Sequence, residues 1–186
     1  MRRIIVSVLV IILLSGCGKE DTQMEEIIKL RRAISECSEC TFKTVVTADY
    51  GDSIYSFGMD CTIDKTGAMN LTVTDPETIS GIAVRIDKDT GKFVFNDKVL
   101  VFEMIADGQL SPVGAPFLLF KALRSGYIST CGMNEEKTVV LISDSFANTQ
   151  YEVQLHLDSS FYPDFAEIIW NGRRILSLDI NEFLIL

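Results

Sequence analysis

The side chains of this sequence best suited to covalent chemistry are five cysteines and a single histidine. The histidine, His156, lies on the polar face of the alternating segment 151–157, which is typical of a solvated strand residue. A Ser-His-Asp or Cys-His catalytic arrangement would have to use this residue. The sequence contains no GxSxG, HExxH, Walker-loop or dinucleotide-binding motif. We therefore expect no catalytic residues and no cofactor.

Cys17 follows a segment typical of a bacterial lipoprotein signal. Two arginines precede the apolar run 4–14, which at eleven residues is shorter than the about 20 needed to span a bilayer. Leu14-Ser15-Gly16-Cys17 looks like the bacterial lipobox, with a bulky aliphatic residue and two small residues before the cysteine. We expect residues 1–16 to be cleaved and the Cys17 thiol to receive diacylglycerol and palmitate-type acyl chains. Several such chains would hold the protein on the extracytoplasmic face of the cell membrane.

The remaining cysteines are Cys37, Cys40, Cys61 and Cys131. An even number of thiols in an exported protein suggests one or two disulfides, and the sequence leaves the pairing open. Residues 37–40 could also form a redox CxxC motif, but they lack the aromatic and Gly/Pro context of the thioredoxin type. No second CxxC or nearby histidine completes a zinc site, so we expect no bound metal.

The charge of the chain excludes some classes of partner. The net charge is −9, and it becomes −11 once Arg2 and Arg3 leave with the signal. Such an acidic chain is unsuited to nucleic acid or to electrostatic adhesion on an anionic membrane. The mature chain is the size of one domain with a single core. We expect a lipidated cysteine and polar tether at 17–23 and a single domain at 24–186.

The apolar residues change their period along the chain. Thr22 and Glu25 resemble a capping box, and helical periodicity predicts a helix from there to about residue 38. Later, prolines and glycine at 112–116 introduce a short apolar helix at 117–123. The other segments alternate between turns in the manner of an antiparallel meander. These segments are 41–49, 55–63, 69–73, 82–86, 93–95, 99–103, 127–131, 138–143, 151–157, 166–170 and 175–180.

These elements predict an α+β fold that is mainly antiparallel β. A sheet of ten or eleven strands with one apolar face does not stay flat. It curls around helices or folds onto itself, and two helices packed into its concave side satisfy the pattern.

The layout resembles the LolA/LolB-like family of lipoprotein carriers, especially its lipid-anchored relatives in Firmicutes, which include germination lipoproteins. The resemblance rests on the N-terminal helix, the meander, Asp75-Pro76 before ISGIAVRID, the apolar central helix, and the final IIWNGRRILSLDINEFLIL. It covers most of the mature chain. The family implies an incomplete, open β-barrel that encloses the N-terminal helix and a short central lid helix. It also implies an apolar cavity for acyl chains and a non-catalytic hand-over of a lipid or lipidated partner.

Bulky apolar residues in the centre of the chain are candidates for the lining of such a cavity. The segment 117–123 is apolar nearly all round, so it is either buried on several sides or faces a hydrophobic ligand. The alternative for each candidate is ordinary core packing. The candidate ligand-binding residues are Phe93, Phe95, Phe102, Met104, Phe117, Leu118 and Phe120.

Three functional hypotheses follow from these observations. The first is a membrane-anchored lipoprotein that binds a lipid, acyl chain or lipidated partner in an apolar cavity. The second is an interaction module of the cell envelope, with a filled core, that docks an exported protein. The third is a redox or hydrolytic enzyme, which would require a reactive thiol or a pocket around His156.

Overall fold

The computed structural model describes residues 18–87, 90–95, 98–102, 105–106, 109–134, 137–146 and 149–186. Among these, the side chains of residues 18–21, 90–109, 146 and 149 are not described. The predicted signal 1–16, the lipidation site Cys17 and the candidate Met104 lie outside the described residues.

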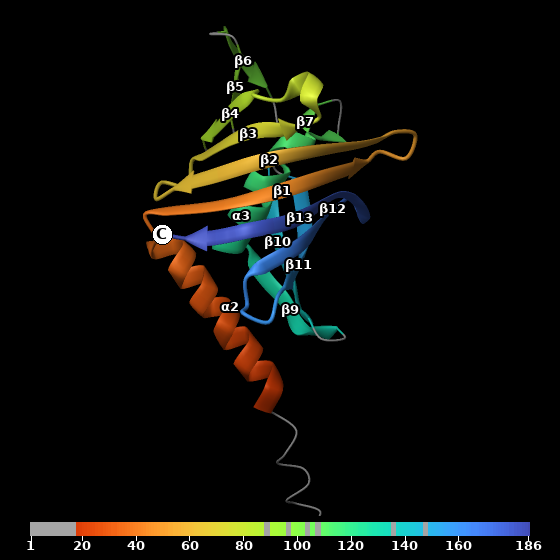
Figure 1. Ribbon diagram of the computed structural model, residues 1–186. Coiled ribbons are helices and arrows are strands. Elements are labelled where there is room, and N and C mark those ends of the chain that lie inside the picture. Colours follow the sequence, from red (N-terminus) through yellow and green to blue (C-terminus); the bar gives the residue numbers. More distant parts are fainter. Residues whose placement is uncertain are drawn as a thin grey trace, which may run out of the picture.

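Eleven strands form one antiparallel sheet, in the order β6-β5-β4-β3-β2-β1-β13-β12-β11-β10-β9 (Figure 1). The first half of the sheet comprises β1 (Glu39–Asp49), β2 (Ile54–Asp64), β3 (Met69–Asp75), β4 (Ala83–Asp87), β5 (Thr90–Phe95) and β6 (Lys98–Phe102). The second half comprises β9 (Tyr127–Asn134), β10 (Lys137–Phe146), β11 (Thr149–Leu157), β12 (Pro163–Trp170) and β13 (Arg173–Ile185). Because β6 and β9 are the two edges, the sheet is an open barrel, as predicted.

Alternating side chains explain why these segments are strands. In β1 and β3, buried and exposed positions alternate along the chain, which is the signature of a sheet with one face on the core. The hairpin between β12 and β13 turns at Asn171 and Gly172, both with positive φ (52° and 74°), the conformation expected for this dipeptide. A separate short pair, β7 (Ile105–Ala106) and β8 (Gln109–Leu110), was not predicted.

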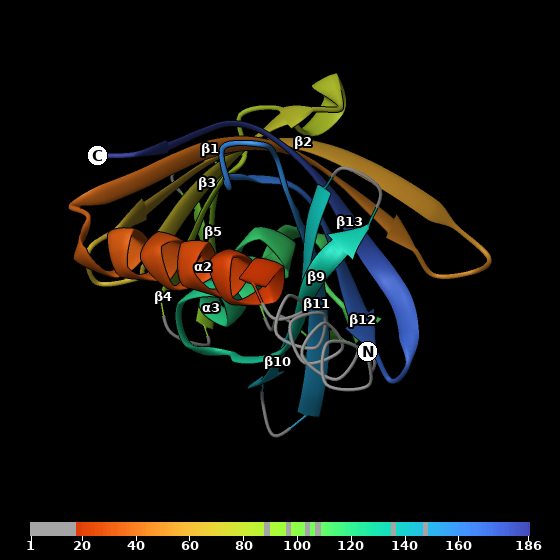
Figure 2. The ribbon, with the colours of Figure 1, turned by 90° about the horizontal axis from the view of Figure 1, so that it is seen from below.

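Two helices lie on the concave side of the sheet (Figure 2). They are α2 (Gly18–Glu36) and α3 (Ala115–Ser125), and short 3-10 turns are η1 (Glu77–Ile79) and η2 (Pro112–Gly114). Ile27, Leu30 and Ile34 of α2 are buried at helical spacing, so this helix docks through one apolar stripe. No helix in the described part of the chain is long and apolar enough to cross a membrane.

The start of α2 differs from the prediction. Residues 18–23 were expected to be a polar tether capped by Thr22, but the helix begins at Gly18 and Thr22 lies inside it. The segment contains no proline, and Lys19, Glu20 and Gln23 are good helix formers, so nothing in it ends the helix early. The described helix therefore extends to the residue that follows the predicted lipidation site in the sequence.

Candidate ligand-binding site

Helix α3 is the element that builds the site. Pro112 begins the preceding turn η2 and Pro116 lies in the first turn of α3, positions where a missing backbone N–H costs little. The helix ends at Gly126, whose N–H donates to the carbonyl of Ala122 at 2.7 Å. A Cβ at Gly126 would lie 2.6 Å from Cγ2 of Ile142, so only glycine allows this approach to β10. Sequence and packing thus fix both ends of the helix.

Arg31 of α2 holds the last turn of α3. Its Nη2 atom donates to the carbonyl of Gly126 at 2.6 Å and to that of Ala122 at 3.3 Å. The final carbonyls of a helix lack partners within the helix and carry partial negative charge, so a guanidinium is a favourable partner for them. Burial lowers the pKa of Arg31, and the charge of Asp144 opposes that shift. This residue was not predicted from the sequence.

A second set of contacts fixes α3 on β10 and β11. The ammonium of Lys121 lies 3.0 Å from both carboxylate oxygens of Asp144 and donates to the carbonyl of Ser145 at 2.7 Å. The hydroxyl of Tyr151 donates to the carbonyl of Leu118 at 3.0 Å. Burial, followed by the charge of Asp144, raises the pKa of Tyr151. The helix is therefore held by β10 and β11 as well as by Arg31.

A cavity of about 780 Å³ lies against the remaining face of α3. Its volume is within the range of about 300–1,000 Å³ that small-molecule sites occupy. Positions 117, 120, 121 and 124 recur at helical spacing, so they share one face of the helix. The described lining consists of Ser35, Thr66, Gly67, Asp87, Phe117, Phe120, Lys121, Arg124 and Ser125.

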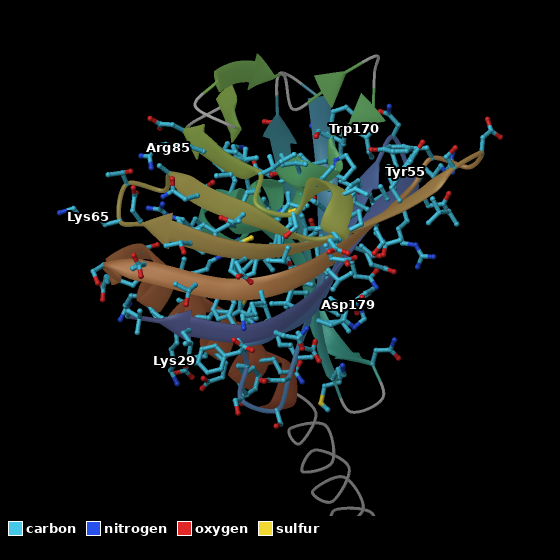
Figure 3. The ribbon with its side chains drawn as sticks, turned by 45° about the horizontal axis from the view of Figure 1, so that its top comes forward. Lys29, Tyr55, Lys65, Arg85, Trp170 and Asp179 are labelled. Atoms are coloured by element: carbon cyan, nitrogen blue, oxygen red, sulfur yellow. The ribbon has the colours of Figure 1, made fainter. Side chains whose placement is uncertain are left out.

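The turn between β2 and β3 forms the opposite wall of this cavity. The carboxylate of Asp64 accepts hydrogen bonds from the backbone N–H of Thr66 at 2.8 Å and of Ala68 at 3.3 Å. The carboxylate also accepts a hydrogen bond from the hydroxyl of Thr66. This bond contributes most to lowering the pKa of Asp64, and the two backbone bonds act in the same direction. Gly67 has φ +85°, and a side chain there would collide with Nη1 of Arg124. Lys65 marks the turn in Figure 3, with its side chain extending away from the protein.

The structure places the predicted lining residues in different surroundings. Phe117 and Phe120 line the cavity, although they are only 7% and 5% exposed and also belong to the core. Leu118 is 0% exposed and belongs to the core alone. Phe93, Phe95 and Phe102 lie in β5 and β6, where only their backbone is described. Met104 is outside the described residues. The sequence analysis missed the polar part of the wall, including Arg124.

The cysteines are thiols in this structure. No disulfide joins Cys37, Cys40, Cys61 and Cys131. Burial raises the pKa of Cys40 to about 12 and also raises that of Cys61, so both remain protonated at neutral pH. Protonated thiols are poor nucleophiles, which weakens the redox reading of residues 37–40. Among the described residues, no three His, Cys, Asp or Glu side chains gather so that they could hold a metal ion.

His156 and Trp170 are outside the cavity. The imidazole of His156 is half-buried on β11, 3.2 Å from the amide nitrogen of Gln154, with its ring edge-on to Phe165. Trp170 is 4% exposed and belongs to the core. Neither side chain is part of the described cavity lining.

Comparison with known proteins shows that this chain is similar in fold to several solved structures. No family model and no curated protein sequence matches the chain. A DUF1329 family protein from Desulfovibrio piger is 8% identical, with 89% of this chain and 92% of that chain covered, at a TM-score of 0.50. LolA superfamily protein NE2245 from Nitrosomonas europaea is 10% identical, with 88% and 93% covered, at a TM-score of 0.49.

A further match comes from the complex of the CwlD amidase from Clostridioides difficile with the GerS lipoprotein. It is 13% identical, with 92% of this chain and 98% of that chain covered, at a TM-score of 0.44. At such identities the similarity concerns the fold alone. An open antiparallel sheet around two helices is what the resemblance in sequence predicted, and this is the arrangement that the described strands and helices have.

Proposed function

We propose that this chain is a membrane-anchored, extracytoplasmic lipoprotein that binds the acyl chain of a lipid or lipidated partner and acts as a non-catalytic carrier. The observation that carries the proposal is the cavity of about 780 Å³ with Phe117 and Phe120 in its wall. Aromatic side chains supply the apolar surface that an acyl chain needs to leave water.

The anchoring half of the proposal rests on Cys17. The lipobox-like sequence supports lipidation there, and α2 begins one residue later at Gly18. Because the predicted anchor and the first described helix are adjacent in sequence, only a short link would separate the domain from the bilayer. The proposed localisation is therefore the extracytoplasmic face of the cell membrane.

Native mass spectrometry tests the carrier function. Residues 18–186, exported to a bacterial periplasm and purified, are expected to carry a stoichiometric lipid or fatty acid that organic extraction releases. Phe120→Ser places a hydroxyl in the cavity wall, and we expect it to abolish the bound mass. Phe183→Ser is the matched control, since Phe183 stacks on Phe42 and is not part of the described lining.

Two results would contradict the carrier function. One is a protein that is free of lipid as purified and takes up none when lipid is added. The other is bound lipid that persists in full in Phe120→Ser, because the lipid would then lie outside the cavity that carries the proposal. Circular dichroism of each variant confirms that the sheet is intact.

A second candidate function is docking of an envelope protein. Ile54 is 68% exposed and Tyr55 is 49% exposed at the start of β2, and Figure 3 labels Tyr55 on the projecting hairpin. Exposed apolar and aromatic residues are common at protein interfaces. If this function holds, Ile54→Ser and Tyr55→Ser will remove crosslinks to an exported protein in intact cells without changing the bound lipid mass.

A further inference from the structure

We infer that Arg124 makes the cavity selective for an amphiphile with an anionic head, either a carboxylate or a phosphate, at the end of a single acyl chain. This inference rests on the proposed function and names the chemical class of its ligand. The guanidinium would bind the head, and the phenylalanine wall would cover the chain.

The first argument is the position of Arg124 on the helix. It follows Phe120 by four residues and Phe117 by seven, so the three residues share the face that lines the cavity. At 1.5 Å per residue, the charge lies about 10 Å along the helix from the first phenylalanine. An apolar stretch that ends in a cation matches a ligand with an apolar chain that ends in an anion.

The second argument concerns the hydrogen-bond and ion-pair partners of the Arg124 guanidinium. Lys121, the other cation of the lining, is neutralised by Asp144 at 3.0 Å. Among the described side chains and carbonyls, none forms a hydrogen bond or ion pair with the half-buried Arg124. A guanidinium presents a planar fork of donors that matches a carboxylate or a phosphate. Within the described residues, Arg124 thus brings donors without a partner to the cavity.

The third argument is that this guanidinium lies against the β2–β3 turn. The side chain passes over Gly67, where even a Cβ would collide with Nη1. Asp64 stiffens that turn through its hydrogen bonds to Thr66 and Ala68. The hydroxyl of Ser35 on α2 also lines the cavity and can donate to the same head group.

Asp87 is the lining residue that opposes an anion. Its carboxylate lies at the exposed end of β4, and no ion pair in the described residues joins it to Arg124. Like charges repel, so Asp87 should weaken the binding of a charged head. Replacing Asp87 with a neutral residue should therefore strengthen the binding of an anionic head group, whereas replacing Arg124 should weaken it.

Photolabelling of the full chain in phosphatidylcholine vesicles tests the inference. The probes are diazirine derivatives of palmitic acid, of hexadecanol and of a palmitoyl lysophosphatidic acid, and the half-saturating concentration of each is measured. Arg124→Gln should raise that concentration about tenfold or more for the carboxylate, the phosphate or both, and leave the alcohol unchanged. Asp87→Asn should lower it for the same charged probe. Arg32→Gln, which removes an exposed charge from α2, is the matched control.

The outcomes separate the inference from the proposed function. The charged probe that depends on Arg124 identifies the head group as carboxylate or phosphate. Equal effects of Arg124→Gln on all three probes, or no effect on any, would overturn the role of Arg124 while leaving acyl-chain binding intact. If none of the probes labels the unaltered protein in the peptides that contain Phe117 and Phe120, the proposed function fails together with the inference.

Discussion

At the scale of single residues, Arg31 joins the two helices by donating to the carbonyls of Ala122 and Gly126. Replacing it with methionine keeps much of its volume and removes both hydrogen bonds. We expect Arg31→Met to lower the free energy of unfolding by about 1–3 kcal/mol, because the carbonyl of Gly126 loses the guanidinium donor at 2.6 Å and that of Ala122 keeps only the Gly126 N–H. Urea denaturation measures the change, and Arg32→Met, at an exposed position, is the control. Equal effects of the two substitutions would contradict the role assigned to Arg31.

Asp64 gives the protein a predictable dependence on acid. Its pKa in the folded state is below the ordinary value, so its charge stabilises the turn fully above about pH 4. That contribution is lost as the pH falls through the lowered pKa. We expect Asp64→Asn to destabilise the protein at pH 7 and the difference from the unaltered chain to shrink at pH 3. Urea denaturation at the two pH values measures it, with the exposed Asp52→Asn as control. A difference that stays constant with pH would refute the role of this charge.

At the scale of elements, α3 combines a packed side with a side that lines the cavity. Leu118 is on the packed side and is 0% exposed. Leu118→Ala should lower the free energy of unfolding by about 2–5 kcal/mol, because it removes apolar burial and leaves a void. Ser125→Ala, at the exposed end of the same helix, should change stability by less than about 0.5 kcal/mol. Thermal unfolding of both variants tests this, and a small effect at Leu118 would mean that the core relaxes around the void.

Local patterns were sufficient to predict most elements, because each strand has one buried face and alternates accordingly. The hairpin at Asn171-Gly172 was predictable because this dipeptide favours the positive φ angles of a tight turn. The pair β7–β8 was missed, since strands of two residues each are too short to show a period. The start of α2 was misplaced because Thr22 and Glu25 match a capping box whether or not the helix begins there.

The site was only partly predictable from the sequence. Phe117 and Phe120 were found because a helix that is apolar all round needs an unusual environment. Arg124 was missed because its importance depends on Gly67, which lies far away in sequence and approaches only through the curvature of the sheet. The partners of Arg31 are likewise carbonyl groups of the chain, and side-chain patterns carry no signal for them.

At the scale of the whole molecule, the prediction concerns how the chain is held in the cell. Cys17→Ser should abolish incorporation of radioactive palmitate into the full chain, since serine offers no thiol for the thioether. Cys37→Ser, in the same cells, should leave labelling unchanged. Labelling that persists in Cys17→Ser would show that the acyl group is attached elsewhere and would remove the basis for the proposed anchor.

The centre of the sheet is the pairing of β1 with β13, in which Cys40 lies opposite Ile185. The two strands are the first and the last of the described sheet, so this contact has a very high contact order. Closing such a long loop is slow compared with forming the local hairpins on either side. Each half of the sheet can therefore form early as a separate meander. The shared concave surface, and any ligand site on it, is completed only when the last strand joins the first.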